Sequence, residues 1–147
     1  MPSVMILEEI VETLKSLDAW EDRYRFLIGL GRSLEPLEEA AHNDANKVVG
    51  CVSRVWIVTR IERPKGSEPV MTFRGDSDAH IVRGLVALIL AIYSGNTATK
   101  ILATDARDLF KELGFSAHLT KQRGNGLCYM IEHIKKDARR VVIDTVA

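Results

Sequence analysis

Two cysteines and four histidines are the side chains of this 147-residue chain best suited to nucleophilic chemistry or soft-metal binding. They are Cys51, Cys128, His42, His80, His118 and His133. The sequence contains no CxxC, HExxH, Walker or GxSxG motif. A structural zinc or an iron–sulfur cluster usually needs about four closely spaced ligands. We therefore expect no resident metal, and a site assembled only by folding is the remaining alternative.

Cys51 is the first candidate for a reactive group. It directly follows Gly50, where a polar stretch gives way to a run of β-branched and aromatic residues. Arg54 is close in sequence, and a nearby cation favours the nucleophilic thiolate over the thiol. The alternative is a small buried hydrophobe, which is the usual role of a free cysteine. That buried structural role is also the expectation for Cys128, which lies beside an apolar helical stripe.

Four charged or titratable residues are further candidates. Asp76 and Asp78 could form a carboxylate pair for acid–base catalysis, but they more simply cap the helix that follows them. Arg123 falls in the first turn of the predicted final helix, where a cation opposes the helix dipole. This placement indicates a functional or ion-pairing role. His118 precedes the same helix and could act as a base for Cys51, or could be a surface histidine.

The N-terminal third of the chain is predicted to be helical. Apolar residues three and four positions apart predict a helix over 7–17. A second helix is expected to restart at Asp18, with Glu21 completing a capping-box-like pair. Residues 32–50 lack a clean period and are predicted to form a long loop, which in a small domain often carries function.

The middle of the chain changes to a β pattern. Residues 55–59 and 70–73 predict an antiparallel hairpin closed by a turn at 63–66, and the first strand is expected to be buried on both faces. Residues 75–78 are expected to supply a turn and the caps of a mostly apolar core helix over 79–93.

The C-terminal third returns to helices. Thr97 and either Thr104 or Asp105 are predicted to cap two short helices that end near Gly114, and Thr120 is predicted to cap a long final helix. The apolar stripe of that helix consists of Leu127, Met130, Ile131, Ile134, Ala138 and Val141. Helices flanking a small sheet are typical of the α+β class.

Composition excludes several classes of protein. Lys plus Arg and Asp plus Glu each number 20, whereas nucleic-acid binders normally carry a basic excess. The longest apolar run, Leu85–Tyr93, has nine residues, and a membrane-spanning helix needs about 20. The N-terminal segment carries Glu8, Glu9 and Glu12 and no basic residue before Lys15, unlike a targeting peptide. We expect a cytoplasmic protein with one domain over residues 1–147.

Four segments resemble the SufE family. Residues 50–58 resemble its GCxSxVW signature, and residues 75–85 resemble its GDSDAxIVxGL motif. Residues 118–130 resemble its HLTxxRxxGLxxM motif, and residues 20–24 its WExRY segment. The segments occur in family order and span most of the chain.

This resemblance implies a fold, a role and partners. The implied fold is the α+β sandwich of SufE and the U-type (IscU-like) scaffolds, with a small antiparallel sheet packed against several helices. The implied role is that of a sulfur acceptor in iron–sulfur cluster assembly, with Cys51 as the persulfide-accepting nucleophile. Asp78, Arg123, Arg54 and His118 are then expected to support the site or contact a partner.

The implied partners are other proteins. They are a SufS- or CsdA-like cysteine desulfurase, which carries the pyridoxal phosphate and is stimulated, and a SufBCD-like scaffold complex that receives the sulfur. A weak homodimer would suit the family, and no cofactor, metal, nucleic acid or membrane is expected. Two other functions remain open: a cysteine-nucleophile hydrolase or transferase using Cys51 with His118, and a non-catalytic adaptor that only binds a desulfurase.

Overall fold

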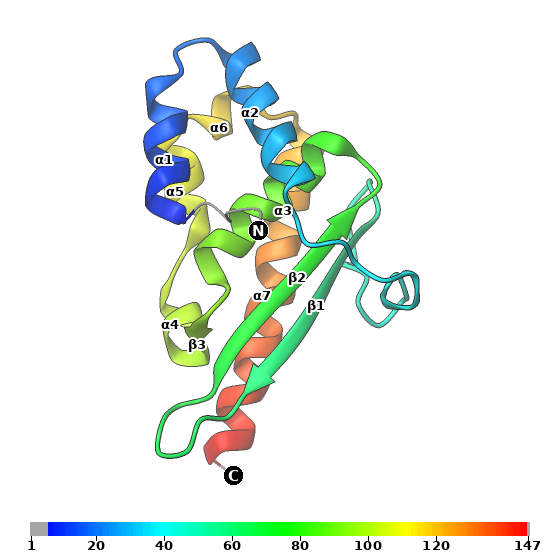
Figure 1. The fold of residues 1–147 in the computed structure, drawn as a ribbon, viewed down its shortest axis with the longest axis vertical. Helices are drawn as coiled ribbons and strands as arrows, with labels where there is room; N and C mark the ends of the chain where they lie inside the picture. The colour runs from blue at the N-terminus through cyan, green and yellow to red at the C-terminus, as the bar shows by residue number, and fades with distance from the viewer. Residues whose placement is uncertain (1–5, 147) are drawn as a thin grey trace.

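The computed structural model describes residues 6–146, which form an α+β fold built around one hairpin (Figure 1). Strands β1 (Val55–Glu62) and β2 (Val70–Ser77) are antiparallel, with Val55 opposite Ser77. The short strand β3 (Asn96–Thr97) pairs with the other edge of β2, which gives the sheet order β1-β2-β3. The predicted fold class and hairpin are confirmed.

The sheet has one buried face and one open face. Val55 and Ile57 of β1 and Met71 of β2 point into the core, and each is at most 1% exposed. Trp56 and Val58 alternate with them and are only partly buried. The predicted burial of the first strand on both faces is therefore wrong. On the outer face, the Trp56 ring packs against His42, and Asp76 pairs with Arg83.

Strand β2 extends further than the sequence pattern predicts, because Gly75 lies inside it. A Cβ atom built on Gly75 would lie 2.7 Å from Cγ1 of Val86, so glycine lets helix α3 (His80–Tyr93) approach the strand closely. Residues 75–77 of the predicted turn are thus strand, and the chain bends only at Asp78. The predicted capping of this helix by Asp76 or Asp78 is also wrong, since its N-cap is Ala79 and makes no side-chain cap hydrogen bond.

Two N-terminal helices, α1 (Leu7–Ser16) and α2 (Trp20–Arg32), lie at one end of the molecule and pack against α3 (Figure 1). The predicted capping box at Asp18 is wrong, because α2 begins one residue later, with Ala19 as an N-cap that lacks a side-chain bond. The side chain of Arg23 instead stabilises the connection between α1 and α2. Its Nε donates to the Leu17 carbonyl at 2.7 Å and its guanidinium also reaches the Leu113 carbonyl at 3.0 Å.

The C-terminal helices start where the sequence predicts. Thr97 caps α4 (Ala98–Ala103) and Asp105 caps α5 (Ala106–Glu112). A short helix not predicted from the sequence, α6 (Phe115–His118), precedes α7 (Lys121–Val146). The hydroxyl of Thr120 accepts a hydrogen bond from the Arg123 amide at 3.3 Å, as its predicted capping role requires.

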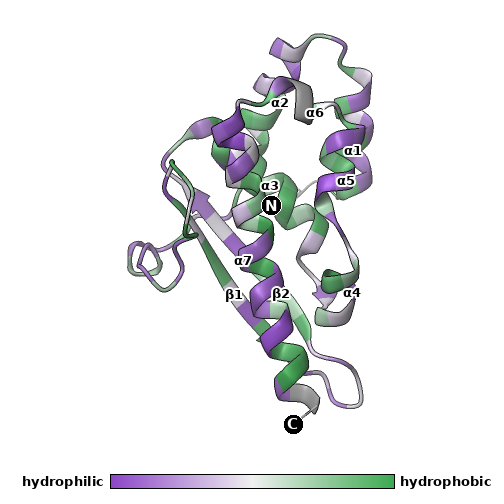
Figure 2. Ribbon diagram, turned by 180° about the vertical axis from the view of Figure 1, so that it is seen from behind, coloured by the Kyte–Doolittle hydropathy of each residue, from purple (hydrophilic) through white to green (hydrophobic). Residues whose placement is uncertain are grey.

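Helices α3 and α7 form the centre of the core. Figure 2 shows α3 as almost entirely hydrophobic, and α7 as alternating between polar and apolar residues while it crosses one face of the hairpin. All six residues of the predicted α7 stripe are buried. In the part of the chain that the structure describes, no helix combines the length and hydrophobicity needed to cross a membrane.

Candidate functional site

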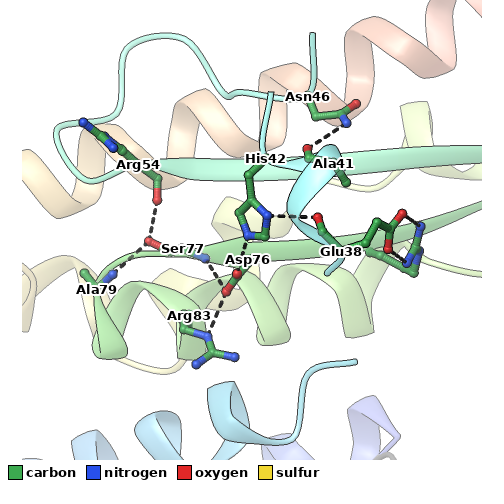
Figure 3. Close-up of polar contacts among 10 residues, drawn as sticks. Glu38, Ala41, His42, Asn46, Arg54, Asp76, Ser77, Ala79 and Arg83 are labelled. Atoms are coloured by element: carbon green, nitrogen blue, oxygen red, sulfur yellow. Dashed lines mark hydrogen bonds and ion pairs between the residues drawn. The ribbon is translucent and has the colours of Figure 1, made fainter. Parts of the chain in front are cut away.

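Cys51 lies on a short loop whose two ends are fixed to the hairpin. On one side, the Val48 amide donates to the Val55 carbonyl at 2.8 Å. On the other side, the Arg54 amide donates to Oδ1 of Asp78 at 3.0 Å, and the Asp78 amide donates back to the Arg54 carbonyl at 3.2 Å. Asp78 therefore holds the loop backbone in place. The Ser77 hydroxyl adds a second bond to the Arg54 carbonyl, at 2.7 Å (Figure 3).

The loop turns sharply at Gly50. Its φ is +100°, a region that other residues rarely adopt. A Cβ atom there would also lie 2.8 Å from the ring of Tyr129 on α7. Backbone conformation and space thus both require glycine immediately before Cys51, as the sequence suggested.

The thiol of Cys51 rests against the first turns of α7. Its Sγ lies 3.5 Å from the carbonyl oxygen of Gly126, to which the thiol donates a weak hydrogen bond. The side chain is half-buried, and this burial raises the pKa of Cys51 to about 11. The expectation that Arg54 would favour the thiolate is wrong for this conformation, because burial outweighs any effect of the exposed guanidinium.

A cavity of about 280 Å³ opens beside Cys51. One wall is apolar and includes Val82, Leu85 and Met130. The polar part of the lining is formed by Ser53, Thr120, Gln122 and Arg123. The structure therefore brings Arg123 to the same cavity as Cys51, where its side chain is exposed and forms no ion pair with any described residue.

Asp76 and Asp78 do not form a catalytic carboxylate pair, because each has its own partners. Asp78 binds the Arg54 backbone, whereas Oδ2 of Asp76 lies 2.7 Å from Nε2 of His42. Asp76 also forms an ion pair with Arg83 of α3 at 3.0 Å (Figure 3).

Cys128 is exposed, so the expectation that it is buried is wrong. It directly follows the buried Leu127, and one residue along a helix turns the side chain by about 100°, away from the core. Within residues 6–146, no three His, Cys, Asp or Glu side chains are grouped so that they could hold a metal ion.

Comparison with known proteins identifies the family. A family model described as "SufE: Fe-S metabolism associated domain" matches residues 8–138. The chain belongs to the SufE family. Its members include proteins of iron–sulfur metabolism, which is the role that the family implies for this chain.

Known relatives are similar to this protein in sequence over most of the chain. An uncharacterised SufE-like protein of Rhizobium meliloti is 48% identical over 132 residues, which are 90% of this chain and 94% of that protein. One of Rhizobium etli is 47% identical over 133 residues, covering 90% and 89% of the two chains. The solution structure of a hypothetical protein from Thermus thermophilus has the same fold, with a TM-score of 0.69, 19% identity, and coverage of 95% of this chain and 99% of that one.

Two of the SufE segments meet away from Cys51. The ring of His118 stacks on Trp20 with a centroid separation of 3.8 Å, and the Tyr24 hydroxyl donates to the His118 carbonyl at 2.6 Å. His118 is not among the residues that line the Cys51 cavity. The proposed Cys51–His118 nucleophile and base are thus not brought together in this conformation.

Two functional candidates were missed by the sequence reading. Tyr129 packs over Gly50, yet it falls at a variable position of the motif over 118–130, so the pattern did not mark it. His42 was one of several scattered histidines, and its partner Asp76 is distant in sequence. Only the fold, which lays residues 38–48 along the hairpin, reveals that pairing.

Proposed function

We propose that this protein is a sulfur acceptor in iron–sulfur metabolism. It takes a persulfide sulfur from a pyridoxal-phosphate-dependent cysteine desulfurase onto Cys51, stimulates that enzyme and delivers the sulfur to a cluster-assembly scaffold. The observation that carries the proposal is the setting of Cys51: a thiol on a tight glycine-led loop, shielded beside a cavity at the SufE signature.

The proposed reaction is a thiol–disulfide-type exchange. Cys51, as the thiolate, attacks the terminal sulfur of the donor's persulfide. The donor's S–S bond breaks as a new S–S bond forms on Cys51, and the donor cysteine leaves as a thiolate. The exchange has no net oxidation or reduction, so one reactive cysteine is sufficient.

The resting conformation protects Cys51 rather than activating it. With its pKa raised to about 11, the thiol stays protonated at neutral pH and is a poor nucleophile. Docking of the donor must therefore draw Cys51 out of its site before transfer. This requirement supports a carrier that reacts with its partner and resists other thiols and oxidants.

The cavity beside Cys51 can accommodate the transferred sulfur. Its volume of about 280 Å³ compares with about 30 Å³ for one water molecule in the liquid. A persulfide formed outside could therefore return into the cavity with the loop. The apolar part of the cavity lining would shield the sulfur, and Arg123 in the polar part offers a cation for the persulfide anion.

The surface around Cys51 suits a protein partner. Val49 is 84% exposed, Val52 is 75% exposed, and Tyr129 is 46% exposed. Apolar side chains exposed together beside a reactive group are typical of a protein-binding site. We assign a SufS- or CsdA-like desulfurase to this surface, with Arg54 and Arg123 as exposed cations beside it, and a SufBCD-like complex as the later recipient.

Mass spectrometry tests the proposal. The protein is incubated with a cysteine desulfurase, pyridoxal phosphate and L-cysteine without reductant, and its peptides are mapped for added sulfur. One sulfur atom on Cys51, retained in Cys128→Ser and absent in Cys51→Ser, is the expected result. No sulfur on Cys51, despite binding of the desulfurase, would overturn it.

The same samples separate the two alternative functions. A hydrolase or transferase would carry an acyl or other substrate-derived adduct on Cys51 instead of sulfur. A non-catalytic adaptor would stimulate the desulfurase equally well as Cys51→Ser. The sulfur-acceptor proposal predicts that this variant still binds the desulfurase but no longer stimulates it.

A further inference from the structure

A cluster of charged side chains fastens the segment before Cys51 to the hairpin (Figure 3). Nε2 of His42, just after the 3-10 helix η1 (Glu39–Ala41), lies 2.7 Å from Oδ2 of Asp76 on β2. Oδ1 of Asp76 accepts the Ser77 amide at 2.8 Å and lies 3.0 Å from the buried Nε of Arg83. Asp76 thus links a loop, a strand and helix α3.

The geometry at His42 requires two ring protons. Its Nδ1 lies 3.0 Å from the carbonyl oxygen of Glu38, and its Nε2 faces the Asp76 carboxylate. Both partners are acceptors, whereas a neutral imidazole carries only one N–H. Only the imidazolium satisfies both contacts, so loss of a proton must break or weaken one of them.

The segment after His42 has few other attachments to the sheet. The Ile57 amide donates to the Asn46 carbonyl at 2.8 Å, and Val48 bonds Val55 as described above. The His42 ring also packs edge-on against Trp56, with centroids 4.6 Å apart. Cys51 follows Val48 by three residues, so these contacts determine how freely its loop can leave α7.

We infer that His42 and Asp76 are positioning residues for Cys51. Their ion pair, which we call the His42–Asp76 clasp, holds residues 42–48 against the hairpin. Deprotonation of His42 then loosens the loop that carries the thiol. The inference takes Cys51 as the reactive group of the proposed function. Its test measures the accessibility of the thiol and needs no desulfurase, so either idea can fail without the other.

The charges around His42 set the direction of the pH effect. From β2 it faces Asp76, and Arg83 of α3 reaches it only through that carboxylate. On its own segment, Glu38 is held by Arg74 in a two-bond pair of 2.9 and 3.1 Å. From β1 it meets the uncharged Trp56.

The hydrogen bond to Asp76 raises the pKa of His42 above the ordinary histidine value, despite opposing desolvation. The clasp is therefore complete below about pH 6.5 and is lost as the pH rises through the folded-state pKa. Arg74 lowers the pKa of Glu38 to about 2, so the Glu38–Arg74 pair does not titrate in this range.

Alkylation of Cys51, followed by peptide mapping, tests the clasp. The rate for His42→Phe, which keeps a ring against Trp56, is divided by the wild-type rate at each pH, so that the pH dependence common to both proteins cancels. We expect a ratio of about threefold to fivefold at about pH 6, falling towards one at about pH 9. Exposed Cys128 is the internal reference, with a ratio of one throughout.

Two further variants separate the clasp from general loosening. Glu38→Gln removes the neighbouring non-titrating pair and should raise the Cys51 rate by the same ratio at both pH values. His42→Arg retains a cation at both pH values, so its rate relative to wild type should be about one at pH 6 and below one at pH 9. The inference is overturned if the rate of His42→Phe relative to wild type is one at pH 6, or if this ratio does not change with pH. If His42→Phe does not fold, His42→Arg decides: an alkylation rate equal to that of wild type at both pH values would overturn the inference.

Discussion

Asp78 binds the backbone of Arg54 on both its amide and its carbonyl side, and this pair of bonds fixes one end of the Cys51 loop to the end of β2. The contact uses the main chain of Arg54 and leaves its guanidinium exposed. Two of the SufE-like segments, residues 50–58 and 75–85, are thus linked by hydrogen bonds.

Removal of the Asp78 carboxylate is predicted to expose Cys51. In Asp78→Ala the Arg54 amide loses its acceptor, which costs about 1 kcal/mol of the free energy of unfolding and frees that end of the loop. Cys51 should then alkylate several-fold faster than in the wild type. Asp144→Ala, an exposed change near the end of α7, is the control and should leave the rate unchanged.

Gly50→Ala is predicted to be costly for two reasons. The new Cβ must adopt a φ of +100° and lies 2.8 Å from the ring of Tyr129. We expect a loss of about 2 kcal/mol in urea unfolding and faster alkylation of Cys51. Gly66→Ala, with a φ of +79° and open space around it, isolates the backbone part and should cost about 1 kcal/mol. Equal losses in both variants would show that Tyr129 does not constrain the loop.

The pH dependence of Cys51 alkylation should report its burial. Because burial raises the thiol pKa to about 11, the rate should still rise about tenfold per pH unit well above pH 9. A rate that levels off near the ordinary thiol value of about 8.5 would contradict the shielded resting state. With a bound desulfurase, the rate at neutral pH should increase.

His133 is predicted to make the fold sensitive to acid. Burial against the sheet lowers the pKa of its imidazole, so its contribution to stability is present above the ordinary histidine pKa and is lost as the pH falls through the folded-state value. Between about pH 7 and pH 5, wild type should lose stability relative to His133→Gln. His80→Gln, at an exposed position, should run parallel to wild type in the same urea titrations.

The sequence predicts the elements of this fold well where one face of an element is apolar. The stripe of α7 and the apolar run of α3 were found because period and burial coincide. The caps Thr97, Asp105 and Thr120 were found because their side chains bind amides two or three residues later, a local relationship.

The errors arise where tertiary contacts override local chemistry. Asp76 and Asp78 have the residue type of helix caps, but their carboxylates bind His42 and the Arg54 backbone, which are distant in sequence. Gly75 resembles a turn residue, but it lies within strand β2, where only glycine leaves room for the side chain of Val86. Cys51 was identified from its motif, whereas its shielding depends on Gly126 of α7 and could not be predicted from sequence.

The short span between the anchors of the Cys51 loop limits how far the thiol can travel. Cys51 is three residues from Val48 and three from Arg54, and a fully extended chain covers about 3.5 Å per residue. While Asp78 holds Arg54, the α-carbon of Cys51 can therefore move only within about 10 Å of that anchor, even if the preceding segment is free. Under the proposed function, a donor sulfur buried deep in another protein would be out of reach unless the delivering cysteine itself moved to cover the rest of the distance.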